Sequence, residues 1–243
     1  MSNSRYRAKV DRPPTVPGSR KANAMTPVTP VTPVEPTVPA PDRDGTAIGR
    51  RAALGVVLER RSTAALSEPA PSGEDLDLIL RAAATVPDHG SLRPWRLVVV
   101  AGEDRRLFAD ALARSAAELD PGLPDEKLEK TRRKAYVAPM QILIVASPVD
   151  SPKVPEWEQI ASASCTGFAI ALAAHALGFG AMWKSVPFTR GVGIIEALEL
   201  GEREQLLGWV NVGTTGPELP TRQDPEPQRF TQTLTTSGLQ PLA

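Results

Sequence analysis

Residues 86–101, VPDHGSLRPWRLVVVA, lead from the end of one helix into the beginning of a strand. The stretch before them, PSGEDLDLILRAAA (71–84), has apolar residues at helical spacing, and Ser72 is a natural N-cap. Glu74 and Asp75 fall in the first turn, where acidic side chains suit the helix dipole. The run of Leu and three Val favours a strand. We therefore predict a helix, a polar loop and a strand in close succession.

The same alternation of helices and strands continues along the chain. The expected strands are Arg96–Ala101, Gln141–Ala146, Ala181–Ser185 and Leu207–Val212, and the expected helices cover 47–60, 103–117, 124–135, 158–177 and 190–199. The glycines of GWVNVGTTG (208–216) are expected in turns. This order of elements predicts an α/β or α+β domain in which helices cover a sheet.

The segment SCTGFAIALAAHAL (164–177) is apolar nearly all round and rich in small residues. A helix of this kind is expected to be buried on every side. Two arrangements would bury it: a place at the centre of a large core, or a subunit interface, since small side chains let another helix approach closely. Trp157, at the start of the same helix, is expected in the core.

The two ends of the chain differ from its middle. The first 45 residues hold nine of the 25 prolines, most of them in TPVTPVTPVEPTVPAP (26–41), and cannot bury enough apolar surface to offset their ordering entropy. We predict a disordered leader over 1–45, a folded domain over 46–230 and a flexible tail over 231–243. GRRAALGVVLERRS (49–62) resembles a twin-arginine signal, but its apolar run is short and closed by charges, which predicts a cytoplasmic protein.

The composition excludes several classes of function. A formal net charge of zero gives no electrostatic reason to expect nucleic acid or an anionic membrane as partner. No segment has the roughly 18 apolar residues of a transmembrane helix. Two histidines and one cysteine are too few for a usual zinc site, and neither a G-x-S-x-G elbow nor a Walker A sequence is present. We expect no nucleic acid, no membrane and no metal.

Arg60, Arg61 and Ser62 form the first of three polar clusters. Two guanidinium groups and a hydroxyl can hold a phosphate, because the planar donor forks match its oxygens. The alternative is structural, with the two cations complementing the dipole at the end of a helix. The spacing alone leaves both interpretations open.

The other two clusters lie in the loop PDHGSLRPW (87–95) and in AMWKSVPFT (181–189). The loop offers Arg93 as well as His89, which could be a general acid or a hydrogen-bond donor, or it is a helix-stop turn capped by Asp88. Lys184 and Ser185 end a strand, where they could grip an anion or simply meet solvent. Three donor-rich clusters with few catalytic groups fit a protein whose chemistry belongs to a bound anionic cofactor.

Taken in order, these stretches resemble the flavin-dependent nitroreductases, and among them the small single-domain NAD(P)H nitroreductases. The resemblance covers about residues 50–225. It rests on ERRSTAALSEPAPSGEDLDLILRAAATVPDHGSLRPWRLVVV (59–100), KVPEWEQIASASC (153–165), LGFGAMWKS (177–185) and LLGWVNVGT (206–214). Each motif is weak alone, and their common order and spacing carry the assignment.

The resemblance implies a three-layer α+β fold, with a central mixed sheet covered by helices, that forms a homodimer with FMN at the subunit interface. The positions that match the family's flavin contacts are Arg60, Arg61, Ser62, His89, Arg93, Trp183, Lys184 and Ser185. The first three would hold the phosphate and ribityl region, and the next two would meet the ring system. The last three would also reach FMN.

The implied activity passes a hydride from NADH or NADPH through flavin N5 to a small acceptor, such as a nitroaromatic or a quinone, by a ping-pong mechanism. No side chain acts as a nucleophile in this scheme. A flavin carrier or sensor without turnover, or another specialised flavin chemistry on the same fold, would use similar binding residues. Arg93 stands where the family commonly has Gln, and the added charge would raise the flavin potential or alter the preferred acceptor.

Overall fold

The structure, a computed structural model, describes residues 54–216, 221 and 225–242. The predicted leader over 1–45 and the first part of the helix expected at 47–60 lie outside the described residues. Residues 54–59 of that helix are helical. Among the residues described, no helix combines the length and the apolar character needed to cross a membrane.

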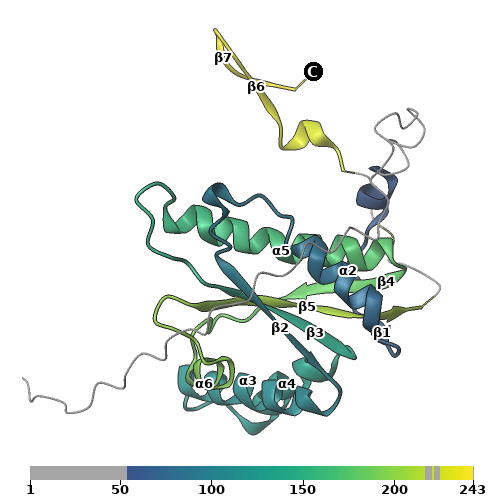
Figure 1. Cartoon of the computed structure of the whole chain (residues 1–243), viewed down its shortest axis with the longest axis vertical. Helices are drawn as coiled ribbons and strands as arrows, with labels where there is room; N and C mark the ends of the chain where they lie inside the picture. The colour runs from purple at the N-terminus through teal and green to yellow at the C-terminus, as the bar shows by residue number, and fades with distance from the viewer. Residues whose placement is uncertain (1–53, 217–220, 222–224, 243) are drawn as a thin grey trace, which may run out of the picture. The chain divides into compact units, whose positions relative to one another are not determined.

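A five-stranded sheet forms the middle of the domain (Figure 1). Its strands are β1 (Leu66–Ser67), β2 (Trp95–Ala101), β3 (Met140–Ala146), β4 (Phe179–Lys184) and β5 (Gln205–Thr215). The main strands lie in the order β4–β5–β3–β2, and β1 pairs with the end of β5. All pairings between these named strands are antiparallel. A bridge between Ser62 and Ala181 adds a parallel pairing at the outer edge of β4.

Helices cover both faces of this sheet, so the domain has three layers (Figure 1). One layer holds α2 (Gly73–Ala83) and α5 (Glu156–Ala176), and the other holds α3 (Arg105–Leu119), α4 (Asp125–Arg133) and α6 (Val192–Leu198). The predicted three-layer α+β fold is confirmed. Ser72 occupies the N-cap position of α2 as expected, but its hydroxyl makes no capping hydrogen bond.

Strand β3 explains why the sheet separates two apolar cores. All seven of its residues are buried, because helices pack on both faces. Ile142 and Ile144 join the core beneath α2 and α5, whereas Leu143 and Val145 join the core beneath α3 and α6. The continuous apolar run in the sequence therefore serves two opposite faces, with alternate side chains pointing each way.

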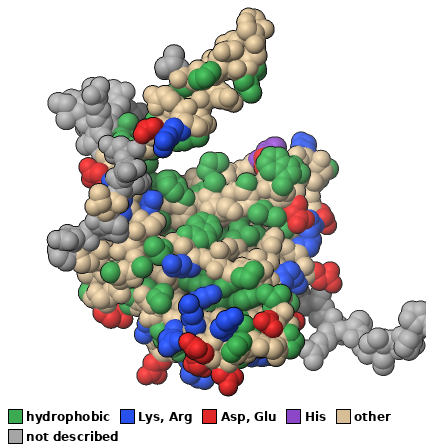
Figure 2. Space-filling view, turned by 180° about the vertical axis from the view of Figure 1, so that it is seen from behind, with side chains coloured by type: hydrophobic (Ala, Val, Ile, Leu, Met, Phe, Trp, Pro, Cys, Tyr) green, Lys and Arg blue, Asp and Glu red, His purple; other side chains and the backbone are tan. Residues whose placement is uncertain are grey.

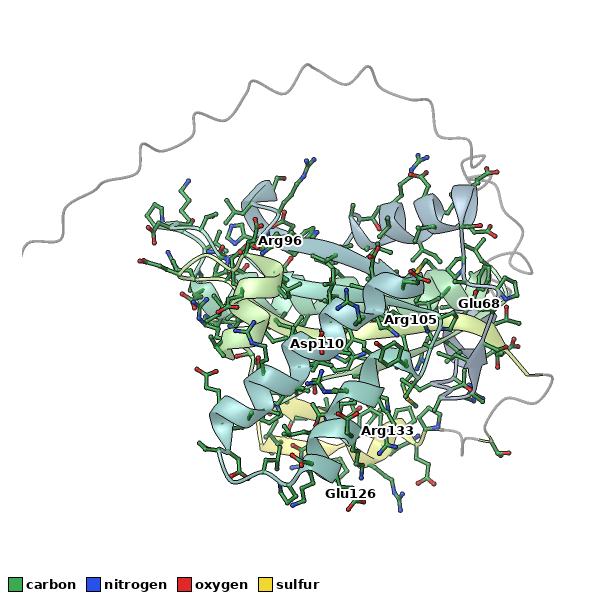
Figure 3. All side chains as sticks on the ribbon, turned by 90° about the horizontal axis from the view of Figure 1, so that it is seen from below. Glu68, Arg96, Arg105, Asp110, Glu126 and Arg133 are labelled. Atoms are coloured by element: carbon green, nitrogen blue, oxygen red, sulfur yellow. The ribbon has the colours of Figure 1, made fainter. Side chains whose placement is uncertain are left out.

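Charged side chains gather on the outside of the layer that contains α3 and α4 (Figure 2). Figure 3 looks onto this layer, with Arg105 and Asp110 on α3 and Glu126 and Arg133 on α4. Arg105 fastens the layer to the sheet, because its Nη1 donates to the carbonyl of Ala138, 3.0 Å away, just before β3.

Helix α5 is not buried on every side, which corrects the expectation from its sequence. Trp157 is 70% exposed and Phe168 is 53% exposed, and Cys165 between them is also exposed. The opposite side of the helix packs on the sheet through residues such as Ile170 and Ala174. Among the described residues nothing covers this apolar helix face, which favours the subunit-interface alternative.

The C-terminal tail predicted over 231–243 contains regular structure. Strands β6 (Gln232–Thr235) and β7 (Gly238–Pro241) form an antiparallel hairpin. Gly238 has φ of 97°, a left-handed value that favours glycine at the end of the tight turn. All eight strand residues are exposed, so neither strand has the alternation of buried and exposed residues by which a strand is predicted from sequence. The flexibility of this segment stays a prediction.

A partly buried ion pair joins a strand, a helix end and a turn at one end of the sheet. The Arg96 guanidinium of β2 donates two hydrogen bonds of 2.8 Å to the Glu204 carboxylate, and Ser147 adds a third of 2.5 Å. These bonds, with one from the Gly201 amide, lower the pKa of Glu204 to about 2. Arg96 also donates to the Leu198 carbonyl at the end of α6. One arginine thus ties β2, α6 and the turn into β5 together.

We expect Glu204→Gln to lower the free energy of unfolding by ~1–3 kcal/mol at pH 7, because it weakens charge-assisted hydrogen bonds. The folded-state pKa is depressed from 4.5, so the carboxylate stabilises the fold above that pH and its contribution is lost as the pH falls toward 2. Urea unfolding of both proteins between pH 7 and pH 3 measures the difference. Glu202→Gln, at an exposed position in the same turn, is the control. A difference that does not shrink at low pH would contradict this account.

Candidate functional site

The first polar cluster lies along the outer edge of β4. Ser62 forms a parallel bridge with Ala181, and the Thr63 amide donates to the Ala181 carbonyl over 3.2 Å. Nη1 of Arg60 lies 3.4 Å from the Ser62 hydroxyl. A guanidinium and a hydroxyl are therefore held beside an edge strand.

Arg61 has a different environment from its two neighbours. Its Nη1 donates to the carbonyls of Leu58, Glu59 and Arg60 at 2.8, 2.7 and 3.1 Å. These are the carbonyls that a helix leaves unpaired at its C-terminal end. The geometry therefore favours the structural alternative for Arg61, which closes the helix that contains residues 54–59.

The third cluster ends the same strand, β4. Trp183 points toward α5 and fills a notch there: a Cβ on Gly167 would lie 1.8 Å from its ring. Its Nε1 approaches Gly208 of β5, where a Cβ would lie 2.7 Å away. Lys184 follows it and, by the alternation of a strand, points to the opposite face. Lys184 and Ser185 are exposed, whereas Trp183 is half-buried and packs against α5.

The structure brings the first and third clusters together. Ser62 lies level with Ala181, and Lys184 is three residues further along the strand. Three residues of a strand span roughly 10 Å. Arg60, Ser62, Lys184 and Ser185 therefore provide cations and hydroxyl groups along one strand edge.

The second cluster is a tightly constrained loop between α2 and β2. Nδ1 of His89 lies 2.9 Å from Oε1 of Glu158 on α5, and the Arg93 amide donates to the Asp88 carboxylate over 2.7 Å. Gly90, Ser91 and Arg93 have φ values of 77°, 53° and 47°. Left-handed conformations at non-glycine residues are costly and concentrate at functional sites. Asp88 occupies the N-cap position of the 3₁₀ turn His89–Ser91 but makes no side-chain capping bond there, and its carboxylate accepts from Arg93 instead.

A cavity of about 270 Å³ lies between this loop and α5. Asp88, His89, Glu158 and Cys165 are among the residues that line it. Two carboxylates at its wall make it unsuited to a phosphate, but not to an uncharged ring. In the described protomer, the loop therefore differs in electrostatic character from the edge of β4.

The loop also lies far from the Ser62 end of the β4 edge within one protomer. The strand registers place Ser62 level with Ala181, Val212, Met140 and finally Ala101, at the far end of β2 from the loop. Six residues along β2 and four strand spacings across the sheet separate Ser62 from Trp95, which amounts to roughly 25–30 Å. One protomer does not bring all three predicted clusters together.

Three features of the site were missed in the sequence. Gly208 lies inside β5 rather than in a turn, and it lets the backbone of Lys184 approach closely. Gly167 lies inside α5, and a lone glycine within a helical pattern is a recognised sign of close packing. Lys134, which shares a pocket with Lys184, ends a run of cations that begins in the last turn of α4, and it carried no distinguishing signal.

Comparisons with known proteins agree with the fold and the motifs. Residues 57–214 match the model of the Nitroreductase family. The chain is 40% identical over 162 residues to "Putative NAD(P)H nitroreductase YdjA" of Escherichia coli (strain K12), covering 67% of this chain and 87% of that protein. A homologue from Haemophilus influenzae, named "Putative NAD(P)H nitroreductase", is 37% identical over 164 residues, covering 67% and 88%.

A solved structure has the same fold. The crystal structure of a nitroreductase-like family protein from Bacillus cereus has a TM-score of 0.60 at 23% identity, and the match covers 74% of this chain and 94% of that one. The family model spans more than half of the chain, and the E. coli relative exceeds one third identity over most of its own length. The chain therefore belongs to the nitroreductase family.

Proposed function

We propose that this protein is an FMN-dependent NAD(P)H oxidoreductase that works as a homodimer. The observation that carries the proposal is the row of donors along the edge of β4, in a chain of the nitroreductase family. Arg60 and Ser62 stand near one end of this row, and Lys184 and Ser185 stand at the other. The names of the curated relatives support NAD(P)H as the reductant.

The residues at this edge fit FMN. A phosphate carries nearly two negative charges and needs several convergent donors, which Arg60 and Ser62 can supply. Beyond Ala181, no further strand covers the outer edge of β4 in the described part of the chain, so backbone donors and acceptors there are available to a polar ring edge. When bound, FMN supplies a ring that accepts a hydride and passes on its electrons.

The side chains of the protein bind and orient in this proposal. Lys184 and Ser185 hold the cofactor at the end of β4. Arg93 brings a cation that favours the negatively charged reduced ring, and His89 adds a hydrogen-bond donor or acceptor. NADH or NADPH would give up its hydride and leave as NAD+ or NADP+ before a nitroaromatic or quinone-like acceptor enters the same place, which is a ping-pong order. No protein nucleophile takes part.

The distance between the clusters supports a site shared by two protomers. His89 and Arg93 belong to a loop whose neighbour Trp95 lies roughly 25–30 Å from Ser62 and roughly 17–18 Å from Lys184, so one flavin is not expected to meet the loop and both ends of this edge within one protomer. The corresponding loop of a second copy would meet the flavin, and the uncovered face of α5 with Trp157 and Phe168 suits the contact. We also propose that the protein works in the cytoplasm, in keeping with the short, charge-closed apolar run before Ser62.

The purified protein is expected to be yellow, and to oxidise NADH or NADPH when a nitroaromatic or a quinone is added. Double-reciprocal plots at several acceptor concentrations should give parallel lines, because the two substrates use one place in turn. Stopped-flow absorbance follows reduction of the bound flavin directly. If the protein binds FMN but NAD(P)H reduces this flavin very slowly or not at all, the protein would instead be a carrier or sensor.

Arg60→Ala and Lys184→Ala are each expected to weaken FMN binding by ~1–3 kcal/mol, the scale of a lost charge-assisted hydrogen bond. Fluorescence titration of the apoprotein with FMN measures the affinity. Lys130→Ala, which removes an exposed cation on α4, controls for net charge. Unchanged affinity in both test variants would show that FMN does not bind along this edge.

Subunit mixing tests the shared site. We expect a Lys184→Ala chain and a His89→Ala/Arg93→Ala chain to be impaired as homodimers, because each lacks one side of every site. A mixed dimer combines both defects in one site and leaves the other intact, so its activity should rise toward half of the wild-type value. Differently tagged chains allow the mixed dimer to be isolated after co-expression. Activity no higher than the mean of the two parent dimers would refute a shared site.

A further inference from the structure

A small pocket opens beside the end of β4, on the sheet face that α3 and α4 cover. It has a volume of about 180 Å³ and is lined by Lys134, Val137, Lys184, Ser185 and Trp209. Lys134 begins the single 3₁₀ turn that follows α4, and Lys184 comes from β4. The pocket therefore joins the strand edge proposed for the flavin to a helical layer that the family motifs do not include.

All the polar side-chain groups around this pocket can donate hydrogen bonds. Lys134 and Lys184 contribute ammonium groups, and Ser185 contributes a hydroxyl. Trp209 is fully buried and its Nε1 already donates to Asn211 Oδ1 over 3.0 Å, so it presents only an apolar surface. Val137 is apolar as well. The lining side chains include no carboxylate and no amide group, so the pocket is chemically suited to a negatively charged hydrogen-bond acceptor.

The two lysines carry charge that the described part of the protomer does not neutralise. No Asp or Glu among the described residues lies within 4.0 Å of either ammonium, whereas Arg132, two residues before Lys134, pairs with Asp110 and Glu129. Lys134 is also half-buried. Two like charges on one small pocket repel each other, and a bound anion would remove that cost.

We propose that Lys134, Lys184 and Ser185 form a subsite for an oxyanion group carried by one of the two reactants. The inference rests on the proposed function, because the pocket adjoins the edge of β4 where the flavin would lie. Its volume suits one phosphate or carboxylate group with a few attached atoms, not a whole dinucleotide. The group is therefore the 2′-phosphate of NADPH or the carboxylate of a nitroaromatic acid.

Steady-state kinetics of Lys134→Ala holoenzyme test this subsite with two matched pairs of substrates. NADPH is compared with NADH, and 4-nitrobenzoate with 4-nitrobenzamide. We expect KM to rise roughly tenfold for the charged member of one pair, the scale of a lost charge-assisted hydrogen bond, while its partner is unaffected. The pair that responds identifies the reactant. Lys134→Arg should retain most of the preference, and Lys130→Ala should behave as wild type.

FMN content and phosphate binding separate this inference from the proposed function. Lys134→Ala should retain its FMN, and inorganic phosphate should raise the melting temperature of wild type and Lys130→Ala more than that of Lys134→Ala at equal ionic strength. Equal effects on both members of each pair, no effect on any, or loss of FMN in Lys134→Ala would overturn the subsite. A wild-type protein without FMN or NAD(P)H oxidation would defeat the proposed function, while the phosphate measurement would still report on the pocket.

Discussion

The register of β5 determines where every candidate group lies. This strand pairs with β3 along one edge and with β4 along the other, and its residue Trp209 stands level with Lys184. If β4 slipped by one residue against β5, each of its side chains would move to the opposite face of the sheet, and Lys184 would face α5. Gly208 keeps this register possible, because a side chain there would collide with the Lys184 carbonyl, 2.3 Å from the position of its Cβ. The missing side chain at Gly208 thus helps to decide which helical layer Lys184 faces.

Much of the fold could be predicted from sequence periodicity. The four main strands and the helices between them lie within a few residues of their expected bounds, because apolar runs and alternation reflect packing on a sheet. The hairpin at 232–241 could not be predicted in this way, since neither of its faces is buried. Helix α5 could be predicted only in part. Its apolar composition indicates burial but does not say whether the protomer or a partner subunit covers the helix.

The candidate site could be predicted in its parts but not in its arrangement. Local motifs identified Arg60, His89 and Lys184, because each has a chemistry that its neighbours in the sequence support. How far apart they lie depends on strand order and register, which no local motif contains. The role of Arg61 is an example, since only the structure shows its Nη1 donating to three helix carbonyls. Lys134 reaches the strand edge from another layer, so its proximity is a tertiary property.

The wide separation of the 88–93 loop from the edge of β4 has a thermodynamic consequence. If two chains must each supply one wall of the flavin crevice, the cofactor binds the dimer more tightly than it binds a single chain. Mass action then requires the reverse as well, so that flavin strengthens the association of the subunits to the same extent. Dilution and flavin depletion become equivalent ways of silencing the protein, and its apparent cofactor affinity depends on how much protein is present.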